Sequence, residues 1–540
     1  MATEAPNPVH MSSAADTRWT TVNFAEAIQG VQKPLGWGMW DLSMETSVRR
    51  SFGAIGALSR SEVPPPASPD DRISGMFFGR AAGNINVFRV LGDRMPGSSG
   101  DLLEEKLFGK EPGPGKTRKP LSAYRRYPVV AFKMPLAARR PPKKLRTMRA
   151  DARTWWQRNT IESPPENLAD AQKLMAEAAQ TFIDVGEHHA TATLLASALL
   201  DQLTTLAEQA TGDPALAMTL ASGYGAMDET ELIEDLWSAS RGDIEIDAVV
   251  KRHGYHGPDE GDLSSHTWRE DTAPLEVLLR NYRKQNLASP REREKVQLER
   301  REAAEVQLLA GLSAAKRPGA KLVLKLASTY IPLREVGKAS FLHALDAARC
   351  AARAGGSALA DAGLLDDAED VFFLTFDEFL AEPDDDMRRR VAERQADHAR
   401  YQELQLPPSW TGAPEPVQRE SDAPAADRPA VETLKGIGVV GQKVTGRARV
   451  IHDPMDADLD DGDILVCKTT DPSWTPLFML AEALVIDTGG AMSHGAIVAR
   501  ELGVTCVINT VTGTKDIPNG ATITVDGATG VVEIGALATA

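Results

Sequence analysis

The chain has 540 residues, 42% of them hydrophobic and 25% charged, and its formal net charge is −16. This length is too great for one hydrophobic core, so we expect two or three domains. No apolar run reaches the roughly 18 residues of a membrane span, and the acidic balance disfavours general nucleic-acid binding. We therefore expect a multidomain protein that binds neither a membrane nor a nucleic acid.

The N-terminus lacks the basic region and apolar stretch of a secretory signal, and residues 1–18 are predicted to be a disordered tail. The cysteines Cys350, Cys467 and Cys506 lie far apart and show no CxxC spacing. This pattern argues against disulfides and against a zinc site, and it fits a reducing cytoplasm. We expect a cytoplasmic protein without a bound metal.

Residues 19–405 are predicted to form one largely α-helical (α+β) domain. Near its start, Trp37 and Trp40 could line an apolar pocket for a substrate, and core packing is an equal alternative. Between Lys106 and Arg158, 16 Lys or Arg residues stand against two acidic ones. This segment is either a solvated basic connection or a docking site for an acidic partner or anionic ligand.

The apolar periodicity predicts the helices of this domain. Apolar residues recur at three- and four-residue spacing over 168–185 and again over 195–206, which predicts two amphipathic helices. Ser289 before Pro290 predicts the start of a charged helix that extends to about residue 312.

A change of composition marks the next boundary. Residues 406–431 are rich in Pro, Ala and charge, which predicts a flexible linker. After it, a helical stretch covers residues 494–502, and six short β-branched runs separated by turn signals predict strands: KVTGRARVI, DILVCKT, ALVIDTG, TCVINT, ATITVDG and GVVEI. Residues 432–540 are therefore predicted to form a small α/β domain.

The run DTGGAMSHGAIVARELG, residues 487–503, carries the strongest functional signal. It predicts a strand, a turn at Gly489 and Gly490, and a helix that begins at His494 after Ser493. A helix N-terminus favours an anion, so a phosphorylated histidine would be stabilised there. By chemistry alone, an ordinary histidine near a helix start is the favoured interpretation.

GGAMSHGAIVAREL closely resembles the phosphohistidine signature of the mobile, swivelling domain in phosphoenolpyruvate synthase, pyruvate phosphate dikinase and rifampin phosphotransferase. The resemblance extends over about 434–536, including DILVCKTTDPSWTPLF and VDGATGVVEI. It implies that His494 is the phosphorylated nucleophile. It also implies phosphate-binding positions around it, at Thr488, Gly489, Gly490, Ser493 and Arg500.

A weaker resemblance to the acceptor domain of rifampin phosphotransferase covers pieces of residues 23–380, among them GYHGPDEGDLSSHTWRED and LREVGKASF. On the second piece, Arg334 and Lys338 would share a helix face and clamp a transferring phosphoryl group, or form an exposed basic face. On the first, His256 is a candidate general base, with a structural turn histidine as the alternative, and Glu260 is a candidate substrate-binding residue.

We find no segment that resembles an ATP-grasp domain, no Walker-type loop, and no room for a phosphoenolpyruvate-binding barrel before Ala540. The domain order is similar to the acceptor-side subunit of two-component aryl-phosphate synthases. We therefore expect no tightly bound cofactor, and ATP with Mg²⁺ on a separate ATP-grasp partner.

The expected activity is a dikinase-type phosphotransfer from His494 to a hydroxyl of a small acceptor, a phenol or alkylphenol, as in phenol degradation. Two alternatives stay open: another acceptor such as an antibiotic, and a non-catalytic phosphocarrier or regulatory protein.

Overall fold

The structure is a computed structural model that describes residues 7–22, 24–108, 118–225, 228–284, 289–418, 432–454, 457–490 and 493–537. The chain forms two compact units. Unit 1 comprises Met1–Ala192, Gly261–Ser265 and Gly337–Glu420, and unit 2 comprises Thr193–Glu260, His266–Val336 and Ser421–Ala540. Helices α7 (Leu168–Thr211) and α14 (Leu333–Asp361) contribute residues to both units.

This division differs from the predicted single domain over 19–405. Residues 193–260 and 266–336 group with the C-terminal domain, because helices from these segments share a hydrophobic core with it. Apolar periodicity reports that a helix has a buried face, but it does not report which partner buries that face.

Unit 1 combines helices with a small antiparallel sheet of strand order β2-β3-β1-β5. Its remaining elements are β1 (Arg18–Thr20), α1 (Phe24–Ala27), α2 (Pro34–Ile55), η1 (Pro69–Asp71), β2 (Ser74–Phe77), β3 (Arg80–Asn84), α3 (Ile85–Asp93), α4 (Gly100–Phe108), η2 (Ala123–Arg126), α5 (Tyr127–Ala138), α6 (Pro141–Gln157), η3 (Arg158–Glu162), η4 (Ala368–Phe373), α15 (Phe376–Leu380), α16 (Met387–Gln402), β4 (Leu404–Gln405), β5 (Ser409–Thr411) and β6 (Val417–Gln418).

Unit 1 extends beyond both ends of the predicted acceptor domain. Residues 7–17 are no tail: the Asn7 side chain donates to Asp397 at 2.6 Å, and Val9 is buried. At the other end, Trp410 of β5 pairs with Trp19 of β1 and packs edge-on against Phe77. Residues 406–418 of the predicted linker therefore belong to unit 1. Residues 1–6 and 419–431 lie outside the described residues.

Helix α7 joins the two helices predicted over 168–185 and 195–206 into one of 44 residues. A glycine, Gly186, lies at the junction, where a Cβ atom would come within 2.5 Å of the Ser47 hydroxyl on α2. The glycine thus permits a close helix–helix approach without interrupting the helix. The predicted helix over 289–312 is confirmed as α12 (Pro290–Gly311), with Ser289 at its N-cap position.

The described part of the basic segment includes α5 and α6. Phe132 on α5 is 73% exposed, and Lys133, Arg139 and Arg140 are exposed around it. The segment is therefore a solvent-facing surface that combines positive charge with apolar side chains.

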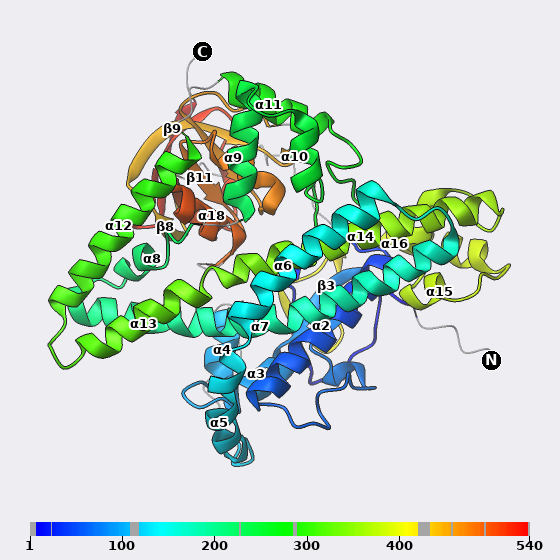
Figure 1. Ribbon diagram of the computed structural model, residues 1–540, viewed down its shortest axis with the longest axis horizontal. Helices are drawn as coiled ribbons and strands as arrows, with labels where there is room; N and C mark the ends of the chain where they lie inside the picture. Colours follow the sequence, from blue (N-terminus) through cyan, green and yellow to red (C-terminus); the bar gives the residue numbers. More distant parts are fainter. Residues whose placement is uncertain are drawn as a thin grey trace. The chain divides into compact units, whose positions relative to one another are not determined.

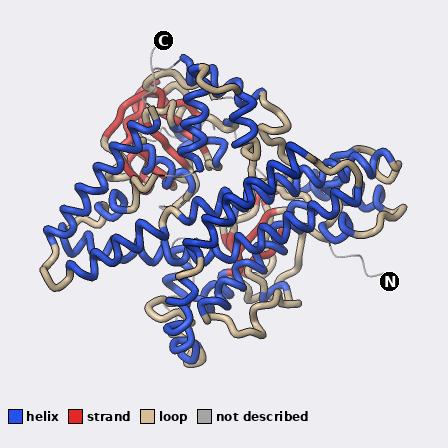
Figure 2. Tube along the Cα trace, viewed as in Figure 1, coloured by secondary structure: helices blue, strands red, loops and turns tan. Residues whose placement is uncertain are grey.

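Unit 2 contains an eight-stranded sheet of order β7-β14-β13-β9-β10-β11-β12-β8 (Figures 1 and 2). Strands β9 to β12 are parallel, and the outer strands pair antiparallel. The elements of unit 2 are α8 (Leu216–Leu220), α9 (Asp228–Arg241), α10 (Ile246–His253), α11 (Ala273–Lys284), α12, α13 (Arg317–Tyr330), β7 (Thr433–Lys435), β8 (Ile437–Val440), β9 (Lys443–Val450), β10 (Asp463–Cys467), η6 (Pro472–Trp474), α17 (Thr475–Phe478), β11 (Ala483–Ile486), α18 (His494–Leu502), β12 (Thr505–Ile508), α19 (Gly513–Asp516), β13 (Ala521–Asp526) and β14 (Val531–Leu537).

The sequence predicted six of these strands and helix α18, which begins and ends at the predicted residues. Strands β10, β11 and β12 are buried along their whole length, as expected of parallel strands covered on both faces. Helix α18 is the crossover between the parallel strands β11 and β12. The C-terminal α/β domain is therefore confirmed.

One face of this sheet shares a hydrophobic core with α9, α10 and α11. Polar contacts reinforce the packing of α11: the Tyr282 hydroxyl donates to the Pro476 carbonyl at 3.0 Å, and the Asn281 amide donates to the Ala457 carbonyl at 2.9 Å. Both donors are buried. Helix α11 is thus fixed to α17 and to the connection between β9 and β10.

In the part of the chain that the structure describes, every helix is too short or too polar to cross a lipid bilayer.

Replacing Tyr282 by Phe should lower the free energy of unfolding by about 1–2 kcal/mol, because the buried Pro476 carbonyl loses its donor. Urea denaturation of the full chain measures this change. The matched control is Tyr124→Phe on the exposed ring of Tyr124, which should change stability by less than about 0.5 kcal/mol. Equal effects of the two variants would contradict the assigned role of the Tyr282 hydroxyl.

Candidate functional site

Helix α18 begins with His494, and the loop before it has the geometry that such a start requires. Ser493 takes the N-cap position with extended backbone, and its amide donates to the Gly490 carbonyl at 2.8 Å. Gly489 has a φ of +139°, and a Cβ atom there would lie 2.8 Å from the Ser493 hydroxyl. The glycine is therefore needed for the chain to turn from β11 into α18. Residues 491–492 lie outside the described residues.

The His494 side chain is 7% exposed and rests against α17. Its Nε2 atom lies 3.3 Å from the Thr475 hydroxyl, and its ring centre is 6.4 Å from that of Phe478. The next residue is Gly495, where a Cβ atom would meet the Thr470 hydroxyl at 2.8 Å. The start of α18 is thus pressed against the segment that connects β10 to α17.

This position favours a negatively charged group on His494. The first turn of a helix has amide N–H groups without intrahelical acceptors, and the helix dipole adds positive potential there. Both effects favour a phosphorylated over a positively charged imidazole. On the loop side, a Cβ atom at Gly490 would meet open space, and Thr488 is exposed. There is room for an anionic group on that side.

Thr475 contacts His494 and was not among the site residues predicted from the sequence. It lies within the run DPSWTPLF, and its hydroxyl can donate to or accept from the His494 ring. That run belongs to the resemblance described above, but one sequence does not show which of its polar side chains turns toward the histidine.

Arg500 was expected to border the phosphoryl group on His494. Because Arg500 follows His494 by six residues in the helix, the two residues are separated by about 120° around the helix axis and by about 9 Å along it. The Arg500 side chain is buried and contacts the Met218 sulfur at 3.6 Å. The structure therefore separates Arg500 from the ring of His494 and brings it to a different group of residues.

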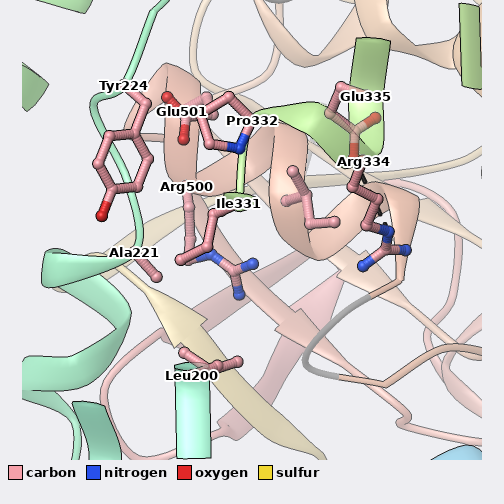
Figure 3. A pocket seen from close by; sticks show the side chains of 10 residues that line it. Leu200, Ala221, Tyr224, Ile331, Pro332, Arg334, Glu335, Arg500 and Glu501 are labelled. Atoms are coloured by element: carbon pink, nitrogen blue, oxygen red, sulfur yellow. Dashed lines mark ion pairs between the residues drawn. The ribbon is translucent and has the colours of Figure 1, made fainter. Parts of the chain in front are cut away.

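That group lines a pocket of about 450 Å³, part of it open to solvent (Figure 3). Helix α18 forms one wall, and the segments around α8 and the start of α14 form others. Arg334 and Arg500 extend into the same space, and Arg334 forms a 3.9 Å ion pair with Glu335 (Figure 3). The lining residues are Leu200, Ala221, Tyr224, Ile331, Pro332, Arg334, Glu335, Ile497, Arg500 and Glu501.

Burial perturbs the charges of this pocket. It lowers the pKa of Arg500 to about 10, with Glu501 opposing that shift and Arg334 adding to it. Burial also raises the pKa of Glu501 to about 7, although the Gly223 amide donates to its carboxylate at 3.0 Å. Arg334 and Arg500 line the same pocket, so the like charge of Arg334 disfavours the charged form of Arg500.

His256 and Glu260 form a buried pair on the loop after α10. The His256 Nδ1 atom lies 2.5 Å from the Glu260 carboxylate, and the exposed fractions of the residues are 1% and 5%. A carboxylate in this position fixes the tautomer and the orientation of the imidazole ring. The backbone holds the loop in place, because the Trp268 amide donates to the His256 carbonyl at 2.8 Å.

This pair lies near the segment that contacts His494. Burial first, and then the charges of Glu260 and Asp259, raises the pKa of Asp471 to about 7. Asp471 precedes Thr475 by four residues, and its carboxylate accepts from the Ser473 amide at 2.9 Å. Glu260 therefore acts electrostatically on Asp471, and His494 contacts Thr475 four residues further along the same segment.

The other expected site residues belong to unit 1. Trp40 is buried, donates to the Gly261 carbonyl at 2.7 Å, and packs edge-on against Phe182. Trp37 is buried as well, so both side chains are core residues in this structure. Lys338 is half-buried one turn after Arg334 on α14. Among the described residues, no cluster of three His, Cys, Asp or Glu side chains could hold a metal ion.

Two protein-family models match the chain. Residues 459–530 match the mobile domain of PEP-utilising enzymes, and residues 168–335 match the fourth domain of rifampicin phosphotransferase. The first match contains His494 and Thr475. The second contains His256, Glu260 and Arg334, and both matches together hold the whole pocket lining.

Curated relatives agree with these matches. A rifampicin phosphotransferase of Streptomyces sviceus is 35% identical over 303 residues, which is 54% of this chain and 34% of the relative. One of Bacillus subtilis is 38% identical over 181 residues, 33% of this chain and 20% of the relative. An uncharacterized protein of Mycobacterium tuberculosis is 39% identical over 219 residues, 41% of this chain and 25% of the relative. The chain thus aligns with about a third or less of each relative.

The raised pKa of Asp471 predicts a pH dependence of stability. Between about pH 4 and pH 7 the folded protein keeps a proton on Asp471 that the unfolded chain has lost, so this stabilisation is full below pH 4 and disappears as the pH rises through 7. Glu501 acts in the same direction.

The variant Asp471→Asn should therefore show a smaller loss of unfolding free energy between pH 5 and pH 8 than the wild type, measured by urea denaturation. The control is Asp461→Asn, at an exposed carboxyl of the same domain. An unchanged pH profile of the Asp471 variant would show that this carboxyl ionises normally.

Proposed function

We propose that the protein is a phosphotransferase that carries a phosphoryl group on His494 and transfers it to a hydroxyl of a small organic acceptor. The observation that carries this proposal is the position of His494 as the first residue of α18, within the segment that matches the mobile domain of PEP-utilising enzymes. The similarity to rifampicin phosphotransferases supports a small-molecule acceptor.

In the first proposed step, a ring nitrogen of neutral His494 attacks the phosphorus of an ATP-derived donor. A P–N bond forms and a P–O bond of the donor breaks, with the leaving oxygen keeping the electron pair. The N–H groups at the start of α18 stabilise the negative charge on the phosphoryl oxygens. The hydrogen bond with Thr475 orients the ring.

In the second proposed step, the acceptor oxygen attacks the same phosphorus, the P–N bond breaks, and His494 leaves as the imidazole. His256 takes the hydroxyl proton, and Glu260 stabilises the imidazolium that results. Arg334 and Lys338, one turn apart on α14, are proposed to neutralise the equatorial oxygens of the transferring group.

We also propose that the phosphoryl group comes from an ATP-grasp partner, which binds ATP and Mg²⁺ and phosphorylates His494. Movement of the phosphohistidine domain between donor and acceptor is part of this proposal. Labelled ATP and a candidate ATP-grasp chain, mixed with this protein, test the donor separately from the acceptor.

Two acceptor classes follow from different observations. The similarity to rifampicin phosphotransferases favours an antibiotic that bears a hydroxyl group. The domain order in the sequence favours a phenol or alkylphenol. A panel that contains rifampicin, phenol, 4-methylphenol and an aliphatic alcohol separates the two.

The His494 proposal can be tested without any partner. Phosphoramidate phosphorylates histidine side chains chemically, and the full chain should gain an acid-labile, alkali-stable phosphoryl group on His494, located by mass spectrometry. The purified phosphoprotein should then yield an organic phosphate with one member of the panel, detected by ³¹P NMR.

His494→Ala should abolish this transfer, whereas His452→Ala, at an exposed histidine of the same domain, should leave it intact. Phosphoryl transfer by the His494→Ala variant would contradict the proposal. A wild-type phosphoprotein that transfers to no small molecule would instead favour a phosphocarrier or regulatory protein.

The proposed clamp gives a second prediction. Arg334→Gln and Lys338→Gln should each slow transfer from the preloaded protein by about 10²–10³-fold, the usual loss for one stabilising donor, without preventing phosphorylation of His494. Lys321→Gln, on the exposed surface of α13, removes the same charge and should have little effect. Rapid-quench kinetics with the acceptor found in the panel measure the rates, and equal rates in all three variants would remove the clamp from the mechanism.

A further inference from the structure

Helices α5 and α6 of unit 1 carry a surface that is strongly basic. Residues 118–149 contain 11 Lys or Arg side chains and no acidic one. Helix α6 buries Pro141, Leu145 and Ala152 along one side. Exposed basic residues lie away from that side or directly before the helix: Arg139, Arg140, Lys143, Lys144 and Arg146. The positive charge of this segment is therefore directed toward solvent.

Helix α5 adds an apolar ridge to these charges. It buries Val130 and Ala137, whereas Phe132 and Leu136, one turn apart, are 73% and 47% exposed. Exposed aromatic side chains together with arginines are typical of protein–protein interfaces. We call the surface formed by these residues the basic face: Phe132, Leu136, Arg139, Arg140, Lys143, Lys144 and Arg146.

The same unit contains a segment of opposite charge. Residues 361–386 contain 11 acidic side chains and no Lys or Arg. The arginines that follow neutralise part of this charge, as Arg390 does for Asp384 at 2.9 Å. Even so, residues 361–394 hold 12 acidic side chains against four arginines, a balance of −8. We call residues 361–386 the acidic segment.

The acidic segment also presents apolar surface. Glu382 and Asp385 are exposed, and Leu380 and Pro383 beside them are partly exposed. Figure 1 shows α5 at the bottom of the view and α15, which lies in the acidic segment, at the right. Because both belong to one compact unit, a second copy of the chain is needed to bring the two surfaces together.

We infer that a second copy of this chain docks on the basic face through its acidic segment. With two-fold symmetry the contact is made twice, which gives a closed dimer. The opposite charges attract and orient the two copies, and Phe132 and Leu136 supply apolar area at the centre of the contact. An anionic membrane fits less well, because it would repel the acidic segment of the same unit.

Sedimentation velocity of the full, unphosphorylated chain tests the dimer itself. The chain should be dimeric at about 0.05 M NaCl, and the dissociation constant should rise at least tenfold at about 0.5 M NaCl, since salt screens exposed charges. This measurement uses neither a phosphoryl donor nor an acceptor, so its outcome is independent of the proposed phosphotransfer.

A charge swap locates the contact. The double variant Lys143→Glu/Lys144→Glu should be monomeric, because its basic face then repels the acidic segment of the second copy. Glu382→Lys/Asp385→Lys should be monomeric for the converse reason. An equimolar mixture of the two variants should form dimers again, since each contact then joins opposite charges.

The apolar ridge has its own variant. Phe132→Ser keeps every charge and should weaken the dimer about tenfold or more, as expected for an aromatic residue at the centre of an interface. The control, Lys321→Glu/Lys325→Glu on the exposed surface of α13, changes the net charge as much as the α6 variant and should leave the dimer intact. Circular dichroism melts verify that each variant is folded.

A wild-type chain that stays monomeric at all concentrations would overturn the inference. A dimer that the α6 variant and Phe132→Ser leave unchanged would also overturn it, as would two monomeric charge variants whose mixture stays monomeric. Monomeric protein that sediments with vesicles of phosphatidylcholine and phosphatidylglycerol, and no longer does so after Lys143→Glu/Lys144→Glu, would assign the basic face to a membrane instead.

Discussion

The start of α18 is the constraint on which the candidate site depends. A parallel strand, β11, ends at a sheet edge, and the chain must reverse there into the crossover helix that leads to β12. Gly489 and the extended Ser493 allow that reversal within a few residues, and Gly495 allows the first turn of the helix to approach Thr470 closely. The consequence is chemical: the first helical side chain, His494, lies where the unsatisfied amides and the helix dipole favour an anion.

The surroundings of His494 depend in turn on the packing of α17. Tyr282 and the apolar residues of α9 to α11 fix the segment that holds Thr475, and Thr475 orients the histidine ring. The same segment contains Asp471, which feels the charge of Glu260 from the loop that carries His256. One short segment, from Asp471 to Thr475, thus connects the histidine proposed as carrier to the histidine proposed as base.

The sequence predicted the features that depend on residues close to one another in the chain. The six strands and α18 were predictable because β-branched runs, turn residues and a glycine-rich helix start act over a few residues. The division into units was not, because the partner of an apolar helix face is decided by packing between distant segments. Thr475 and the pocket were missed for the same reason. Arg500 is different: its six-residue spacing from His494 already places it on another side of the helix, so helix geometry alone could have corrected that expectation.

The start of α18 and its later residues therefore contact different groups of residues. The face at its start positions His494 against α17, whereas Ile497, Arg500 and Glu501 form the wall of a pocket that belongs to the helical part of unit 2. A helix is rigid over nine residues, so any ligand or protonation event that shifts one end of α18 must also displace the other. Burying Arg500 and Glu501 in the pocket costs desolvation free energy, as their shifted pKa values indicate. Apolar side chains could make a purely structural contact there at lower cost, so the burial of Glu501 depends on the hydrogen bond that its carboxylate accepts from the Gly223 amide.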